Sequence, residues 1–367
     1  MRSKKNLETE GRRNSRTKAT ELHRTTWKIL MVFKEKSVKI CGNLWLNILV
    51  LSFFSGVFAK NEYFYRINQE WHSSEVFTYC VLPGQKVEIE IINLPSDKEM
   101  LKQMKDRRVA YHKENRATEE ISFLPIEWTA PQEPGLYPLG ALDFLPQNTN
   151  LTSRRLLNII VMIPPEKVKN GRLNGFLIGH YPKNKMPLGF IEVTEENKDT
   201  YISEHFQLKD FLCPQNSGFP QYLVLDMKLV EKLEILIKKL NSEGYPCSKF
   251  AILSGYRTPY YNRSRPGRAR ESRHMYGEAA DIFVDDLPKD GMMDDLNGDG
   301  QVNMKDAEII AKATKELNDL GILPGGYAAY PATKQHGPFV QVDTRGYSVT
   351  WRTTRRKTYS HLKGKRK

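Results

Sequence analysis

The stretch SRHMYGEAADI, residues Ser272–Ile282, decides the fold of this 367-residue chain. It places His274 seven residues before Asp281. Upstream, AILSGYR (Ala251–Arg257) is an apolar run followed by a glycine, which predicts a buried strand that leads into a loop. Downstream lies GGYAAYPATKQHGPFVQVDTRG (Gly325–Gly346). A single His and Asp at this spacing would be a weak signal, whereas three blocks in this order are specific.

Together with SGYRTPYYN (Ser254–Asn262), these blocks resemble the M15 peptidases, the zinc D-Ala-D-Ala carboxypeptidase and L,D-endopeptidase class. They are similar to the periplasmic branch, whose pattern is roughly SGYR-x-P, S-x-H-x-x-G-x-A-x-D-I, GG-x-G-x-Y and FVH-x-D-x-R. The resemblance covers residues 185–352. It implies an α+β peptidase fold on an antiparallel sheet, a zinc cofactor, and hydrolysis of peptidoglycan stem peptides by a D,D-carboxypeptidase or endopeptidase.

The resemblance also implies a role for single residues. In this family a His, an Asp seven residues later and a second His on a later strand hold the zinc, which leaves one position for water. His274 and Asp281 match the first two positions. Such a zinc lowers the pKa of its water toward about 7 and polarises the scissile carbonyl. Arg257 matches the family arginine that holds a substrate carboxylate or the developing oxyanion, with a structural salt bridge as the alternative.

Two further residues are candidates for the chemistry. His336 lies five residues before Gln341, and some relatives place a proton-transferring His there, so it is the expected general acid or base. The alternative is a loop histidine bonded to the backbone. Asp343 follows Gln341 by two residues, so on a strand it faces the same side and is expected to support the site or act as a base.

Gln341 departs from the family pattern. Where the pattern has FVH, this chain has Phe339, Val340 and Gln341. A glutamine offers only a neutral carbonyl oxygen, which is a poor zinc ligand beside imidazole. Three interpretations stay open: Gln341 or His336 completes a weakened zinc site, the protein is a pseudo-peptidase that binds cell-wall peptides without cutting them, or the site serves another metal or chemistry.

A second metal signal is independent of the first. DLNGDGQVNMKD, residues 295–306, matches a 12-residue EF-hand-type calcium loop with Gly300 at its tight turn. An Asp at the last position is shorter than the usual Glu, which predicts weaker binding. A single loop in an exported domain predicts a structural calcium clamp rather than a sensor. The expected ligands are Asp295, Asn297, Asp299, the Gln301 carbonyl and Asp306.

Outward from these motifs, the chain divides into several parts. Residues 60–165 contain short strand patterns between Pro/Gly turns, such as KVEIEII (Lys86–Ile92), which predict a small β-sandwich domain. A connector follows over 166–187, and the peptidase-like domain spans 188–352. Apolar residues at helical spacing predict a helix from about Val224 to Leu240. The other expectations are a helix or loop over 97–118 and strands at 126–131, 156–165, 174–182 and 188–194.

The two ends of the chain carry its basic charge. Residues 1–59 hold 12 Lys/Arg against 4 Asp/Glu, and the tail holds 8 basic and no acidic residues from Arg352 on, so the body between them is slightly acidic. The apolar run 44–59 ends Val-Phe-Ala and predicts a signal peptide preceded by a basic leader, with Met31 as a more ordinary start. We therefore expect a periplasmic or exported bacterial protein with a basic tail over 353–367. It is anchored at the inner membrane only if the segment is uncleaved, and nucleic acid is not an expected partner.

Three cysteines would remain after the signal, at positions 80, 213 and 247. An odd number does not imply a complete disulfide framework. An oxidising compartment would allow one bridge, for example Cys213–Cys247. The sequence fixes neither this pairing nor the oligomeric state.

Overall fold

The computed structural model describes residues 62–94 without 69 and 73, 121–122, 126–140, and 156–351 without 183, 184, 216, 266 and 267. The expected signal peptide, the charged segment 97–118 and the basic tail lie outside these residues. None of the helices in the described part of the chain combines the length and apolarity that crossing a bilayer requires.

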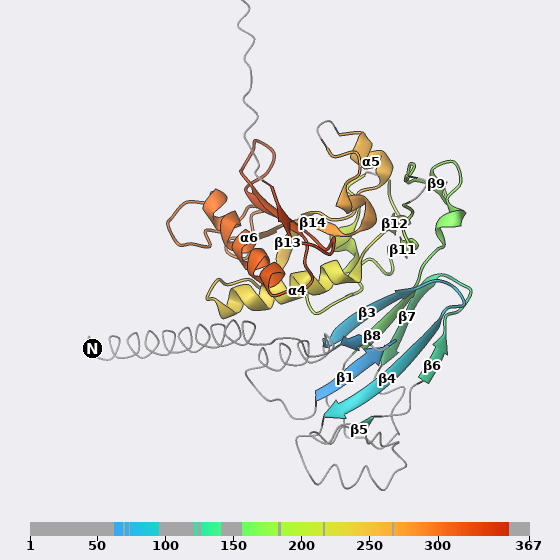
Figure 1. The fold of residues 1–367 in the computed structure, drawn as a ribbon. Coiled ribbons are helices and arrows are strands. Elements are labelled where there is room, and N and C mark those ends of the chain that lie inside the picture. Colours follow the sequence, from blue (N-terminus) through green and yellow to red (C-terminus); the bar gives the residue numbers. More distant parts are fainter. Residues whose placement is uncertain are drawn as a thin grey trace, which may run out of the picture.

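The first part of the chain forms two β-sheets (Figure 1). One has the order β2-β1-β4-β5, with β6 also paired to β4, and all its pairs are antiparallel. In the other, of order β3-β8-β7, β3 runs parallel to β8 and β7 antiparallel to it. The strands are β1 (Glu62–Ile67), β2 (Glu70–His72), β3 (Val76–Val81), β4 (Lys86–Leu94), β5 (Ile121–Ser122), β6 (Ile126–Thr129), β7 (Gly135–Gly140) and β8 (Leu156–Val161).

One hydrophobic cluster joins the two sheets. Val87 and Ile89 of β4 are buried while Glu88 between them is exposed, as the alternation of KVEIEII predicted. Leu157, Ile159 and Val161 of β8 meet them from the other sheet. Each sheet thus buries one face against the other.

The middle of the chain is built from short elements. The expected strand over 174–182 is only the two-residue β10, because Asn174 and Gly175 take positive φ values of 47° and 88° and form a tight hairpin. The expected strand over 188–194 is β11, which pairs antiparallel with β12. The elements are η2 (Pro165–Lys167), β9 (Arg172–Leu173), β10 (Phe176–Leu177), β11 (Ile191–Val193), η3 (Leu208–Phe211) and β12 (Gln221–Leu223).

The last part is a mixed α and β unit on a five-stranded sheet of order β13-β14-β16-β15-β17. Its pairs are antiparallel except β15–β17. Helices α4 and α6 contact each other, and α6 packs on β15 and β16 (Figure 1). The elements are α4 (Met227–Ser242), β13 (Phe250–Ser254), α5 (Pro259–Arg263), η4 (Arg273–Tyr276), β14 (Ala279–Val284), α6 (Met304–Asp319), β15 (Gly326–Tyr330), β16 (Phe339–Asp343) and β17 (Val349–Thr350).

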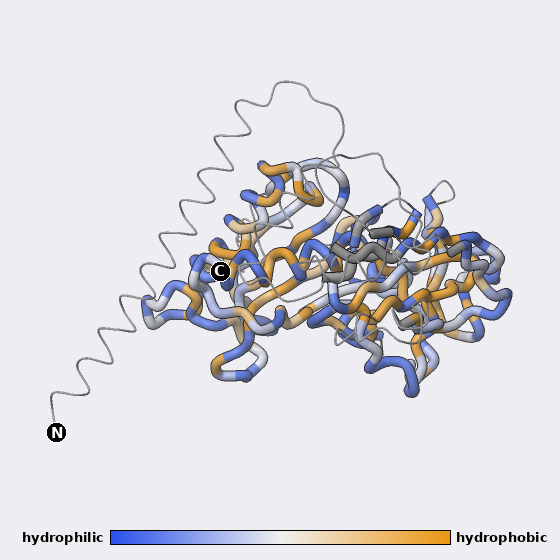
Figure 2. Tube along the Cα trace, turned by 90° about the horizontal axis from the view of Figure 1, so that it is seen from below, coloured by the Kyte–Doolittle hydropathy of each residue, from blue (hydrophilic) through white to orange (hydrophobic). Residues whose placement is uncertain are grey.

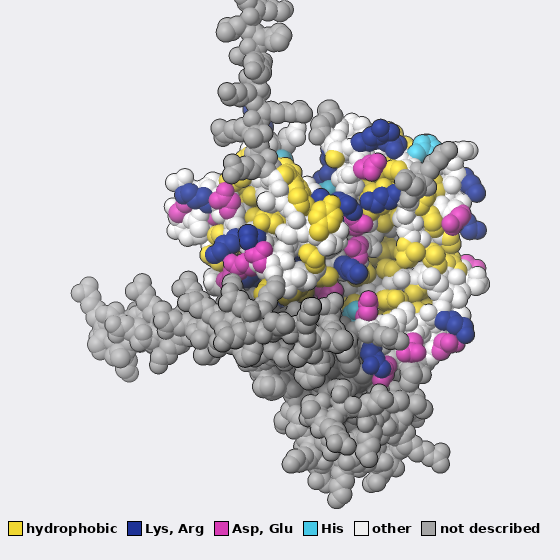
Figure 3. All heavy atoms as spheres, viewed as in Figure 1, with side chains coloured by type: hydrophobic (Ala, Val, Ile, Leu, Met, Phe, Trp, Pro, Cys, Tyr) yellow, Lys and Arg dark blue, Asp and Glu magenta, His cyan; other side chains and the backbone are white. Residues whose placement is uncertain are grey.

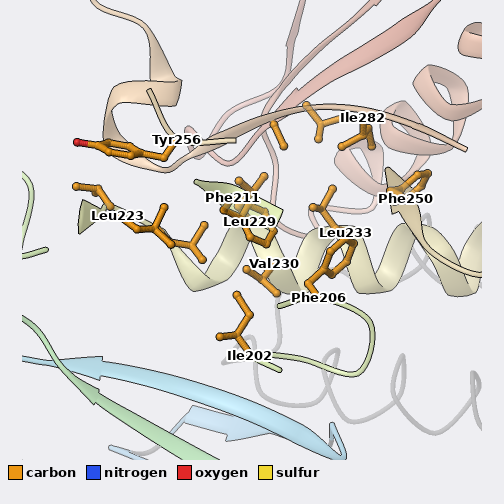
Figure 4. Packing of buried hydrophobic residues seen from close by; sticks show 14 of the residues in the cluster. Ile202, Phe206, Phe211, Leu223, Leu229, Val230, Leu233, Phe250, Tyr256 and Ile282 are labelled. Carbon is orange, nitrogen blue, oxygen red and sulfur yellow. The ribbon is translucent and has the colours of Figure 1, made fainter. Parts of the chain in front are cut away.

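Helix α4 lies between this sheet and the segment that carries Ile202 and Phe206 (Figure 4). Its buried apolar face includes Leu229 and Leu233, which the helical spacing predicted. The helix begins three residues later than expected, because the side chain of Asp226 accepts a hydrogen bond from the Lys228 amide and caps it. Hydrophobic segments lie mainly along the interior strands and helices, and hydrophilic ones mainly in the loops (Figure 2).

The described cysteines are free thiols, so the Cys213–Cys247 bridge is not formed. Instead the Cys213 sulfur accepts a hydrogen bond from the Thr258 amide at 3.4 Å. Burial raises the pKa of the Cys247 thiol to about 12. Both thiols are interior packing groups in this structure.

Candidate functional site

The site is built on the five-stranded sheet of the last part of the chain. Asp281 of β14 is the register partner of Ser254 on β13 and of Gln341 on β16, and Gln341 also faces Ala328 of β15. Directly opposed residues on neighbouring strands project on the same face of a sheet. The chain therefore places the Gln341 and Asp281 side chains next to each other, which the spacing of the motifs alone does not show.

His274 reaches this point from the short helix η4. It is fully buried, and its Nδ1 lies 2.7 Å from the carbonyl oxygen of Gly255. The carbonyl can only accept, so Nδ1 carries a proton, and in the neutral imidazole Nε2 then presents a lone pair. Nε2 lies 3.4 Å from Oδ1 of Asp281. Neither atom has a hydrogen-bond partner in the structure.

This pair of buried atoms without partners fits a metal ion. Two ligand atoms, each about 2.1 Å from a tetrahedral ion, lie about 3.4 Å apart. Buried polar atoms in native proteins almost always have a partner, so two facing ones indicate a missing bound group. The Gly255 carbonyl fixes the imidazole tautomer as outer contacts of metal-bound histidines do.

Gly277 allows the chain to turn from η4 into β14. Its φ is +64°, and an added Cβ would meet the Val224 carbonyl oxygen at 2.3 Å. Only glycine tolerates both constraints. This position sets how His274 approaches the sheet.

Arg257 holds the other oxygen of Asp281. Its Nη2 donates to Asp281 Oδ2, and its Nε donates to Ser254 Oγ at 2.8 Å. Burial raises the pKa of Asp281, but its contacts with His274 and with the charged Arg257 lower it by more, so its net pKa lies below the usual range. The carboxylate is therefore ionised, and one end of the guanidinium that was expected to meet substrate is bonded within the site.

Gln341 is held by Tyr330, which is held in turn by Trp351, and the sequence motifs did not predict either aromatic residue. Tyr330 Oη donates to Gln341 Oε1 at 3.4 Å, a long hydrogen bond, and accepts from Trp351 Nε1 at 2.9 Å. Burial raises the pKa of the Tyr330 phenol and the nearby Asp281 charge adds to this, while the Trp351 bond opposes it. Tyr330 lies in the third sequence block, Gly325–Gly346. The motif alone does not show how β15 pairs with β16, and this pairing brings Tyr330 close to Gln341.

His336 makes its described contacts within its own loop and with the strand that follows it. It lies in the loop between β15 and β16, where its ring packs edge-on to Phe339 at 4.9 Å. Its Nδ1 lies 2.7 Å from the Gly337 carbonyl oxygen. No hydrogen bond or ion pair joins it to His274 or Asp281 among the residues that the structure describes. These contacts match the alternative of a loop histidine bonded to the backbone.

Asp343 is an interior anchor in this structure. It is fully buried, and its carboxylate accepts hydrogen bonds from Arg345 and from the Gly326 amide at 2.6 Å. Burial raises the pKa of Asp343, but the hydrogen bonds from Arg345 and from the Gly326 amide lower it by more, so its net pKa is lowered. Both oxygens are committed to these partners, so its contacts do not support the expected catalytic role.

The loop 295–306 is closed by hydrogen bonds from its own backbone. The Asp295 carboxylate accepts from the amides of Gly298 and Gly300 at 2.9 and 2.7 Å. Buried Asp306 accepts from the amides of Leu296 and Asn303 at 3.0 and 2.8 Å. Gly300 has the positive φ, +80°, that the tight turn requires. The carboxylates of this loop do not converge into a three-ligand group in the described structure.

Comparison with known proteins supports the family assignment of part of this unit. Residues 204–298 match the family model described as Peptidase M15. The matched segment contains Arg257, His274 and Asp281, and it ends before the strand that carries Gln341. A search of curated proteins and a search of solved structures gave no match. The matched segment is thus similar to M15 peptidases, and this similarity suggests a metallopeptidase.

Proposed function

We propose that this protein is a zinc metallopeptidase that cuts peptidoglycan stem peptides, as a D,D-carboxypeptidase or endopeptidase. The observation that carries the proposal is the facing pair of partnerless atoms, His274 Nε2 and Asp281 Oδ1, at 3.4 Å. The Peptidase M15 match over 204–298 supports it. The periplasmic location and the stem-peptide substrate follow from the resemblance of the sequence blocks.

The residues of the site divide the work. His274 and Asp281 would hold the ion, with the Gln341 carbonyl as a weak third donor. A zinc ion in such a site supplies a Lewis acid and an acidified water. Arg257 keeps Asp281 ionised and oriented, and its fixed charge favours a carboxylate or oxyanion of the substrate. Tyr330 lies beside the site as a hydroxyl donor.

Gln341 sets the expected strength of the site. A neutral amide oxygen binds zinc less well than imidazole. We therefore expect measurable but weak zinc affinity. Activity should then need added zinc, in contrast to a protein with three strong ligands.

A second function is favoured by one specific observation. The Gln341 oxygen already accepts the Tyr330 hydroxyl, and Arg257 is already paired with Asp281. A site satisfied in this way fits a pseudo-peptidase that binds wall peptides without cutting them. Calcium bound in the loop 295–306 would act as a structural clamp under either function.

One experiment separates the two functions. The full chain, with calcium present, is incubated with peptidoglycan and added zinc, and released fragments are identified by mass spectrometry. A loss of D-Ala or of cross-links supports the peptidase if a chelator prevents that loss. Retention on peptidoglycan with no product at any zinc concentration overturns it in favour of the pseudo-peptidase.

A further inference from the structure

A second group of metal-ligating side chains lies away from this site. The ligand atoms of Glu204, His205 and Glu234 all lie within 4.8 Å of one another. Glu234 comes from α4, while Glu204 and His205 come from the loop that precedes η3. Figure 4 shows this loop, with Ile202 and Phe206, between α4 and the strands of the first two sheets.

The Glu234 carboxylate is held in one orientation. Its side chain is only 7% exposed. Oε1 accepts from Ser203 Oγ at 2.6 Å and from the His205 amide at 2.9 Å. Oε2 lies 2.6 Å from His205 Nδ1. Carboxylates that bind metals are commonly oriented by hydrogen bonds from outer groups, as Glu234 is by Ser203 and the His205 amide.

The charge of this group is not balanced internally. Two carboxylates surround one imidazole, which carries at most one positive charge, so the group is anionic overall, and burying excess negative charge is costly. Lys238 approaches only Glu204, at 3.2 Å, and its side chain is 46% exposed. No lysine or arginine reaches Glu234 in the ion pairs of the described residues. A divalent cation would balance both carboxylates at once.

We propose that Glu204, His205 and Glu234 form a second zinc-type cation site, separate from the His274–Asp281 site. Two carboxylates and one imidazole are a ligand set that zinc accepts, with water completing the coordination. Ligands of one tetrahedral ion stand about 3.4 Å apart. His205 therefore moves back from Glu234 by less than about 1 Å when the ion replaces its proton, and its place on a surface loop allows this.

The location gives the site a consequence for the fold. Two carbonyls of the same loop accept hydrogen bonds. The Ile202 carbonyl accepts from Thr78 Oγ1 at 2.8 Å, and the Tyr201 carbonyl accepts from Asn158 Nδ2 at 2.8 Å. These donors belong to β3 and β8. A cation that ties the loop to α4 therefore stabilises the junction between the first sheets and the peptidase-like unit.

The test uses the full chain with calcium in excess and zinc as the probe. A His274→Ala, Asp281→Asn double variant removes the first site, so the result does not depend on the proposed peptidase activity. We expect this variant to retain one zinc per chain and to melt at a higher temperature with zinc. Adding Glu204→Gln or His205→Asn should weaken zinc binding by at least about tenfold. Glu195→Gln, an exposed glutamate already paired with Lys198, is the matched control and should change nothing.

A further variant guards against simple misfolding. Lys238→Met removes the cation that competes for Glu204, so it should tighten zinc binding, a gain that an unfolded protein does not show. The proposal is overturned if the double variant binds no zinc. It is equally overturned if Glu204→Gln and His205→Asn leave zinc affinity unchanged, because the cluster is then a hydrogen-bonded link between the loop and α4.

Discussion

His274 Nε2 and Asp281 Oδ1 face each other at 3.4 Å, buried and without other partners, while Gln341 is the cross-strand partner of Asp281. This relationship leaves two good metal ligands beside one poor one. The identity of residue 341 therefore controls how tightly the site holds an ion.

Restoring the imidazole should strengthen the site. We expect Gln341→His to bind zinc roughly 10- to 100-fold more tightly, because an imidazole nitrogen replaces a neutral amide oxygen. Peptidoglycan hydrolysis should rise with it. Zinc affinity is measured by competition with a chelator, and products by mass spectrometry. Gln335→His, the same change at an exposed position of the β15–β16 loop, is the control. Equal affinity in wild type and Gln341→His would show that residue 341 does not contact the ion.

The turn before β14 should be intolerant of any side chain. We expect Gly277→Ala to destabilise the fold by roughly 3 kcal/mol or more, because its Cβ meets the Val224 oxygen at 2.3 Å and the backbone is left-handed. Gly291→Ala is the control: its φ is similar, +81°, but no atom lies within 4 Å. It should cost only about 1 kcal/mol. Urea unfolding measures both, and similar losses would show that the clash is relieved by a backbone shift.

Much of the fold was predictable where one periodic signal dominates. The alternation in β4 and the helical spacing in α4 follow directly from burial of one face. The boundaries were less predictable, because the Asp226 cap decides where α4 begins. The strand expected over 174–182 was wrong in length, since Asn174 and Gly175 turn the chain back at once.

The candidate site was predictable only in its sequence-local part. The motif identifies His274 and Asp281, and their juxtaposition is what the structure adds. Tyr330 meets Gln341 because β15 pairs with β16, and Trp351 reaches Tyr330 from the end of the sheet's last strand, which no local pattern encodes. Asp343 was expected to take part in the chemistry because of alternation alone, but alternation does not show that Arg345 already occupies its carboxylate.

Calcium should stabilise the fold through the loop 295–306. At a calcium concentration about 100 times Kd, binding adds about 2.7 kcal/mol, which raises Tm by roughly 5–10 °C for a unit of this size. Asp295→Asn should remove most of this rise, because it takes a charged ligand from the first loop position. Thermal melts with calcium and with a chelator measure it. Asp290→Asn, just outside the loop, should keep the rise, and a calcium effect that survives Asp295→Asn would place the ion elsewhere.

Lys232 should make stability depend on pH in the alkaline range. It is fully buried, and its Nζ donates to the Asp343 carbonyl at 2.9 Å and to Asn318 Oδ1 at 3.3 Å. Burial lowers its pKa from 10.5 to about 8, partly opposed by the Asp343 charge. Between these two pKa values the unfolded chain binds a proton that the folded chain does not. The free energy of unfolding contributed by this group therefore rises with pH across that window, by on the order of 3 kcal/mol in full.

The matched variant for this effect is Lys232→Met, which keeps an unbranched side chain only one atom shorter and removes the amine. We expect wild type to gain stability relative to Lys232→Met as pH rises from about 8 toward about 10. At pH 7 the variant avoids burying a charge but leaves the Asp343 carbonyl without its donor, a loss of about 1–3 kcal/mol. The pH dependence of the difference between the two proteins is therefore the diagnostic quantity. Urea unfolding at several pH values measures this difference, and a constant difference would show that the lysine stays charged in the folded protein.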